Sequence, residues 1–79
     1  MTALENIKKA EAIFKVRTMV CDDLFEALGK SSAALDEMDQ NCELYGLALT
    51  NHETIDKKHY AAVLLQRSAG ESLQLLESL

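Results

Sequence analysis

The fold is decided by residues 7–28, IKKAEAIFKVRTMVCDDLFEAL, in which apolar side chains recur at alternate steps of three and four residues. The same spacing continues to residue 49, with polar residues on it at Arg17 and Ser31. A helix turns by about 100° per residue, so side chains at this spacing share one face. This apolar seam consists of Ile7, Ala10, Phe14, Arg17, Cys21, Leu24, Leu28, Ser31, Leu35, Met38, Cys42, Tyr45 and Leu49. The pattern predicts an all-α protein.

The composition agrees with one small helical domain. The 79 residues include no proline and three glycines, so the frequent turns of a multi-stranded β domain have no support. Apolar residues make up 48% of the chain and charged residues 27%, which is typical of a sequence that folds. Because two domains of half this length would each be too small to fold unaided, we expect residues 1–79 to form a single domain.

Charge and hydropathy argue against two classes of partner. Eight basic and thirteen acidic side chains give a formal net charge of −5, the wrong sign for binding nucleic acid through its phosphates. Even the apolar run at residues 61–65 is far shorter than a membrane span, and the first residues show no secretory signal pattern. We therefore expect a cytoplasmic protein that binds no nucleic acid and has no membrane span.

The boundaries of the first helix follow from capping residues and length. Thr2 and Glu5 have the spacing of a capping box, so the helix is expected to begin at Thr2. One helix from Thr2 to Leu49 would exceed about 70 Å. We therefore expect a break at residues 29–32, GKSS, where a glycine precedes two possible serine caps. Residues 21–23 are a second possible break, and the continuous seam favours an unbroken helix as the alternative.

The hairpin turn is predicted at residues 50–54, TNHET, where the apolar spacing lapses and an asparagine suits a helix end. Asp56 is the expected N-cap of the next helix, with Ile55 and Tyr60 at the spacing of a hydrophobic staple.

These boundaries predict an antiparallel helical hairpin with an additional N-terminal helix. The hairpin helices would span about residues 31–50 and 56–78, and the N-terminal helix would run from about Thr2. A small three-helix arrangement is then possible.

The last helix is predicted to have two apolar faces. One face consists of Ala62, Leu65, Ala69, Leu73 and Leu76, and is expected to pack on the seam at residues 35–49. The opposite face consists of Tyr60, Val63, Leu64 and Leu75. The N-terminal helix could cover this second face through Ile13, Val16 and Val20, or another protein could cover it.

One stretch of the sequence resembles a known family. Residues 56–60, DKKHY, followed by the leucine and alanine period through Leu79, resemble the second helix of the small needle-subunit co-chaperones of bacterial type III secretion systems, the YscE, PscE and SsaE group. The opening residues 1–5, MTALE, are also similar to that group. The resemblance implies a short helical hairpin in the bacterial cytoplasm. It also implies that the hairpin binds a tetratricopeptide-like chaperone, and that together they keep the needle subunit monomeric before export.

We therefore predict that the chain acts by binding a protein through Tyr60, Val63, Leu64 and Arg67. The alternative is a homodimeric helical regulator or inhibitor, bacterial or phage, that associates through the same seam. A homo-oligomer is also possible for the isolated co-chaperone.

Catalytic, cofactor-binding and metal-binding residues are not predicted. Cys21 and Cys42 lie on the seam without a Cys-x-x-Cys motif, so buried reduced thiols are expected rather than a disulfide or redox pair. His52 and His59 with the two cysteines match no zinc template. A metal-binding enzyme is kept as a third class.

Overall fold

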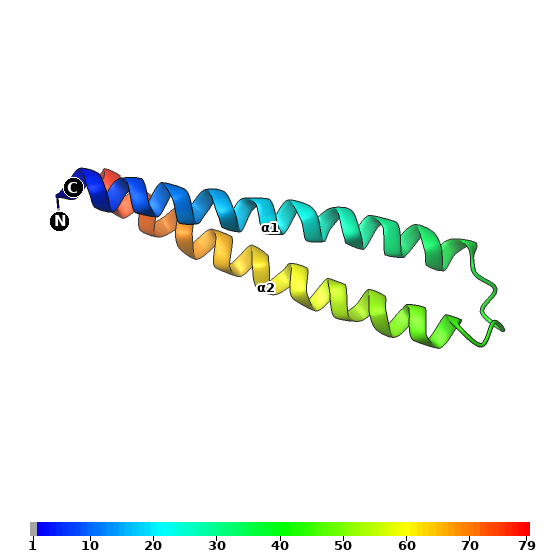
Figure 1. Cartoon of the computed structure of the whole chain (residues 1–79). Helices are drawn as coiled ribbons and strands as arrows, with labels where there is room; N and C mark the ends of the chain where they lie inside the picture. The colour runs from blue at the N-terminus through cyan, green and yellow to red at the C-terminus, as the bar shows by residue number, and fades with distance from the viewer. Residues whose placement is uncertain (1) are drawn as a thin grey trace.

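The computed structural model describes residues 2–79, which form a hairpin of two long α-helices without a strand (Figure 1). Helix α1 spans Ala3–Glu37 and helix α2 spans Tyr45–Glu77, joined by residues 38–44. The chain ends lie together at one end of the hairpin, so the helices are antiparallel. The predicted all-α hairpin is confirmed. Met1, the first residue of the stretch 1–5 that resembles the co-chaperones, lies outside the described residues.

Helix α1 begins where its capping residue predicts and does not break. The Thr2 side chain accepts a hydrogen bond from the Glu5 backbone N–H at 3.2 Å. The break expected at residues 29–32 is wrong, because Leu28, Ser31 and Leu35 keep the seam facing α2. A glycine inside a helix costs only about 1 kcal/mol relative to alanine, so Gly29 alone does not end the helix. The additional N-terminal helix is therefore not a separate element but the first half of α1.

The hairpin turn lies at residues 38–44 rather than at the predicted residues 50–54. The Asn41 backbone N–H donates to Asp39 Oδ1 at 2.9 Å, and the Cys42 N–H donates to the Asp39 carbonyl at 2.9 Å. An aspartate side chain that bonds the backbone two residues on is a common turn-forming contact. This turn ends α1 at Glu37, so the predicted hairpin helix over residues 31–50 is also wrong.

The residues predicted to form the turn lie inside α2, and Asp56 does not cap a helix. The Thr50 and Thr54 hydroxyls donate to backbone carbonyls four residues earlier, at 3.0 and 2.9 Å, so their polarity is satisfied on the helix itself. His52 and Ile55 are half-buried on the side that faces α1. The stretch 50–54 is thus part of a continuous helix and is exposed except at His52, and residues 56–60 belong to the middle of α2.

The tightest contact joins α2 to the first half of α1, not to residues 35–49. The buried residues are Cys21 on α1 with Ala62 and Ala69 on α2. The Gln66 side-chain amide donates to Thr18 Oγ1 at 3.0 Å, which fixes the register between the helices. Of the predicted inner face of α2, Ala62, Ala69, Leu73 and Leu76 are buried or half-buried, whereas Leu65 is 54% exposed.

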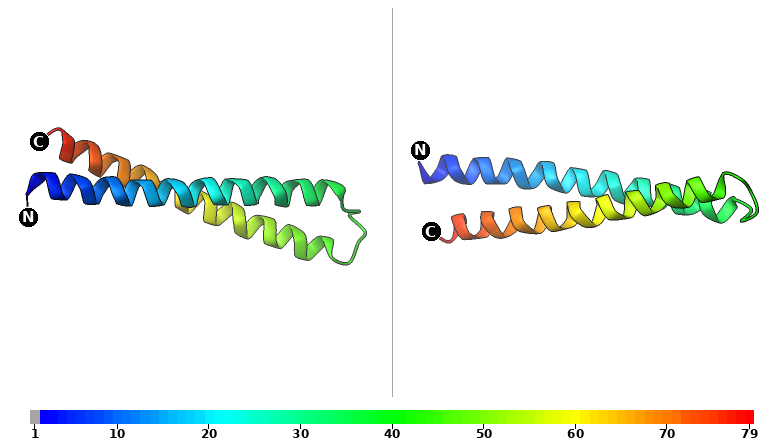
Figure 2. Two further views of the ribbon diagram at one scale, coloured as in Figure 1. Left: turned by 45° about the horizontal axis from the view of Figure 1, so that its top comes forward. Right: turned by 90° about the horizontal axis from the view of Figure 1, so that it is seen from below.

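The hairpin is a thin rod. The ribbons overlap at the chain ends and separate toward the loop in Figure 1, whereas the right-hand view of Figure 2 shows the reverse, so the helices wind about one another. The rod measures 60 × 16 × 13 Å and has a radius of gyration of 17.8 Å. A compact domain of this length would have a radius of gyration of about 12 Å. Neither α1 nor α2, within residues 2–79, is long and apolar enough to cross a membrane.

Candidate interaction surface

The rod exposes more surface than a compact protein of its mass. Its accessible surface is 6113 Å², whereas a compact monomer of 8.8 kDa exposes about 4,800 Å². No large side chain of residues 2–79 is fully buried. The exposed large apolar residues are Leu4, Ile13, Val16, Met19, Val20, Phe25, Leu44, Leu47, Leu49, Tyr60, Leu64, Leu65, Leu75 and Leu79. Two groups of apolar residues within the rod form continuous surfaces.

The first group contains the residues predicted to bind a partner, and we name it the Tyr60 surface. It consists of Tyr60, Val63, Leu64 and Arg67, at relative positions 0, 3, 4 and 7 along α2. This spacing aligns the side chains along one stripe of the helix. Tyr60 is 68% exposed, Leu64 and Arg67 are exposed, and Val63 is half-buried beside the helix contact. The structure therefore places the four residues on one stripe of α2, with three apolar or aromatic side chains followed by a cation.

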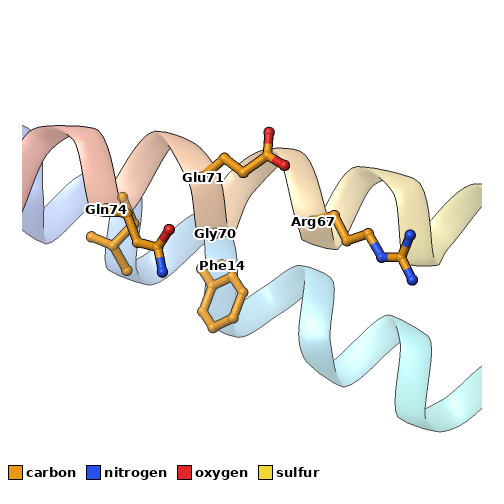
Figure 3. A pocket seen from close by; sticks show the side chains of 6 residues that line it. Phe14, Arg67, Gly70, Glu71 and Gln74 are labelled. Carbon is orange, nitrogen blue, oxygen red and sulfur yellow. The ribbon is translucent and has the colours of Figure 1, made fainter.

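Arg67 also borders a shallow pocket that extends the Tyr60 surface toward the chain ends (Figure 3). The Phe14 ring lies against Gly70, and Glu71 and Gln74 also line this pocket. A Cβ atom at Gly70 would lie 3.2 Å from Phe14 Cε2, so the missing side chain leaves the space that the ring needs. Gly70 thus permits close packing of α1 on α2.

The second group lies on the other side of the helix pair, and we name it the Val16 surface. It consists of Ile13, Val16 and Val20 on α1 with Leu65 on α2. Val20 and Leu65 line one small hollow, and Ile13 and Val16 line another. Leu65 and Val63 are about 200° apart around α2, so they flank the helix contact from opposite sides.

Of the two covers considered for the second face of α2, the one through Ile13, Val16 and Val20 is wrong. Val16 is 59% exposed, and all three residues lie away from the Tyr60 surface. An unbroken α1 cannot fold back, so these side chains remain on the outside of the rod. Sequence reasoning missed this second surface, although the steps of three and four between Ile13, Val16 and Val20 are its signal.

Arg17 lies between the two helices at the edge of the Val16 surface. Its guanidinium Nη1 donates to the Leu65 carbonyl at 2.9 Å, so the cation is tied to the backbone of α2. Its apolar stem lines the same hollows as Val16 and Val20. The arginine therefore extends the apolar surface across the helix pair, although it interrupts the seam in sequence.

The cysteines and histidines are not gathered into one site. Within the described residues both cysteines are free thiols; Cys21 is buried as expected, but Cys42 is exposed because it lies in the loop rather than on a helix seam. His52 Nδ1 lies 3.1 Å from Ser31 Oγ, and the His59 ring lies 5.8 Å from the Phe25 ring. In the part of the chain that the structure describes, no three His, Cys, Asp or Glu residues could hold a metal ion together.

Comparisons with protein-family models, with curated proteins and with solved structures found no match. A functional assignment therefore rests on the hairpin and its two exposed surfaces.

Proposed function

We propose that the chain acts by binding a protein partner, as a small bacterial co-chaperone whose apolar surface is covered in the complex. The observation that carries this proposal is the absence of any fully buried large side chain among residues 2–79. A hairpin of this kind is stabilised when a partner covers its exposed apolar residues, because binding to the folded state alone shifts the folding equilibrium. The partner gains in the same way by covering its own apolar surface.

The Tyr60 surface is the part of the rod that we assign to the partner. Tyrosine and arginine are enriched at the centres of protein interfaces, since each combines a large contact area with a polar group. Tyr60 and Leu64 offer the apolar area, and Arg67 offers hydrogen bonds to carbonyl or carboxylate groups. An amphipathic helix with anchors at relative positions 0, 3, 4 and 7 suits a groove in the partner.

The resemblance supplies the class of partner. It implies a tetratricopeptide-like chaperone, whose stacked helices form concave surfaces that can receive a helix. The two proteins would together hold the needle subunit of a type III secretion system as a monomer in the bacterial cytoplasm. The hairpin architecture agrees with the fold that the resemblance implies.

The proposal is tested by purifying the tagged chain from the cells that produce it and identifying the proteins that co-purify in stoichiometric amounts. We expect a protein of tetratricopeptide-like repeats, together with a small secreted subunit. The variant Tyr60→Ala/Leu64→Ala should lower recovery of the chaperone by about tenfold or more, because truncating interface anchors commonly costs more than 1 kcal/mol each.

The matched control is Leu47→Ala, which removes an equally exposed apolar side chain of α2 outside the Tyr60 surface. Its recovery of the chaperone should equal that of the wild type, and circular dichroism should show the same helicity for every variant. Absence of a stoichiometric helical-repeat partner would contradict the co-chaperone assignment. Equal recovery by the double variant would contradict the role of the Tyr60 surface.

A further inference from the structure

The exposed stripe of α1 has charged ends at equal distances from Val16, seven residues before it and seven after it. Lys9, Ile13, Val16, Val20 and Asp23 follow one another at steps of four, three, four and three residues. This spacing is that of a heptad seam, so the five side chains lie along one line of the helix. The line has a base at one end, an acid at the other end and branched apolar residues between them. It is distinct from the seam that packs on α2.

We propose that a second copy of the chain packs antiparallel along this stripe, with a two-fold axis at Val16, to form a four-helix bundle. A two-fold interface pairs residue i with j and residue j with i. Reversing the stripe about Val16 places Val16 against its own copy. Ile13 of each copy then lies one residue along the helix from the position opposite Val20 of the other. The same reversal brings Lys9 of each copy to Asp23 of the other. The stripe is therefore complementary to itself in the antiparallel orientation only.

The charges at the two ends of the stripe select this orientation. A parallel pair would place Lys9 against Lys9 and Asp23 against Asp23, and like charges in contact are unfavourable. Lys9 also interacts within its own chain, but an ammonium group has three donors and can serve more than one acceptor. Asp23 is exposed. Each antiparallel dimer would thus hold two such ion pairs, one at each end of the apolar contact.

The surface area agrees with a dimer. The hairpin exposes 6113 Å², about 1,300 Å² more than a compact monomer of its mass. This excess includes the Tyr60 surface, which the dimer leaves accessible, so the two copies would bury less than about 2,600 Å² in total; a stable interface needs about 1,200–2,000 Å². A bundle of four helices would also be about twice as thick as the present rod, whose smallest dimension is 13 Å.

The shape of the Val16 surface fits a second helix. Its two hollows are lined almost wholly by apolar atoms and can receive side chains of a facing helix. On α2, Leu65 is accompanied by Ala61 and Ser68, at four residues before and three after it, and small residues let a neighbouring helix approach closely. The Tyr60 surface lies on the other side of the helix contact and remains accessible. The dimer is therefore independent of the proposed partner binding.

Sedimentation of the full chain over a range of concentrations tests the proposal. We expect the wild type to form a dimer, and Val16→Glu to raise the dimer dissociation constant about 100-fold, because two carboxylates would meet on the axis. Leu64→Glu is the matched control, since it places the same charge on an exposed position of the Tyr60 surface and should leave the dimer intact. Circular dichroism of each variant reports whether the hairpin is folded.

Charge reversal at the two ends of the stripe tests the antiparallel register. It also tests whether the stripe forms the dimer if Val16→Glu loses helicity. Lys9→Glu and Asp23→Lys should each raise the dissociation constant about five- to tenfold, because each reversal affects both symmetric ion pairs. The double variant Lys9→Glu/Asp23→Lys should restore the wild-type value, since it exchanges the members of each pair. In a parallel dimer each single reversal would only replace one pair of like charges by another, so the dissociation constant would not rise.

Three results would overturn the proposal. They are a wild-type chain that stays monomeric at every concentration, an unaltered dimer in folded Val16→Glu, and a double reversal that fails to recover association. A monomeric wild type would leave the Val16 surface to a different protein.

Discussion

The half of the hairpin that contains the chain ends packs more tightly than the half that contains the loop. The terminal half, residues 3–21 and 62–77, includes the three buried residues, Cys21, Ala62 and Ala69. The loop half, residues 22–37 and 45–61, has no buried residue. The loop therefore connects the two helices in the half that packs less. In the other half, where the chain ends are free, side-chain packing holds the helices together.

Side-chain size explains this difference. In the terminal half α2 presents small residues to α1, and Phe14 reaches the helix at Gly70. In the loop half the helices meet through larger or polar residues, such as Ser31 with His52 and Phe25 with His59. Such groups keep access to water and hold the helix surfaces apart, so less apolar area is removed from solvent. Most of the packing free energy should therefore come from the terminal half.

The largest expected effect comes from the same substitution made in each half. Phe14→Ala should lower the free energy of unfolding by about 2–3 kcal/mol, since a half-buried ring leaves a gap against Gly70. Phe25→Ala should lower it by less than about 1 kcal/mol, because that ring is 66% exposed and lies 5.8 Å from the His59 ring in a tilted arrangement. Urea denaturation at one fixed protein concentration measures both values.

Equal losses of unfolding free energy for the two phenylalanine variants would show that the two halves contribute equally to stability. That result would contradict the proposed difference between them. A larger loss at Phe25 would reverse it.

The seam that forms the hairpin was predictable because α1 needs apolar residues facing α2 along its whole length. This requirement leaves a regular spacing in the sequence. The seam residues from Ile7 to Leu35 recur at steps of three and four. Each apolar residue among them lies toward α2. The start at Thr2 was predictable because its cap is a local contact between residues three apart. Both features depend on the sequence within one helix.

The position of the turn was not predictable from the same spacing. The pattern continues by coincidence through Met38, Cys42 and Tyr45, although the chain leaves the helix at Glu37. The signal for the turn is Asp39, whose carboxylate bonds the Asn41 backbone. His52 on the seam of α2 also concealed the continuity of this helix, because histidine counts as polar in a hydropathy pattern but can fill a half-buried position.

The incorrectly predicted break in α1 also affected the prediction of the exposed surfaces. The Tyr60 surface was identifiable because its residues share one stripe of a single helix. The exposure of Ile13, Val16 and Val20 depends on whether α1 is broken, and that is settled by tertiary packing rather than by local preference. A break at Gly29 would have allowed these residues to fold back.

A smaller effect is expected from filling a glycine in each half. Gly29→Ala should raise the free energy of unfolding by up to about 1 kcal/mol, because alanine favours the helix and no atom lies within 4 Å of the new Cβ. At Gly70 the new Cβ would lie 3.2 Å from Phe14 Cε2, so the ring must move by a few tenths of an ångström. We expect this displacement to cancel at least half of the gain. Equal gains, measured by thermal and urea unfolding, would mean that the terminal half is no tighter at this point.

The smallest expected effect compares one side-chain hydrogen bond from each half. Thr18→Val removes the acceptor of the Gln66 amide beside the tight contact, and should cost about 1 kcal/mol. Ser31→Ala removes the bond to His52, but water can replace it in the open loop half and alanine favours the helix, so the loss should stay below about 0.5 kcal/mol. If urea unfolding gives Ser31→Ala the larger loss, the loop half is held by its polar contacts more strongly than its burial indicates. Packing area would then no longer explain where the stability of the rod resides.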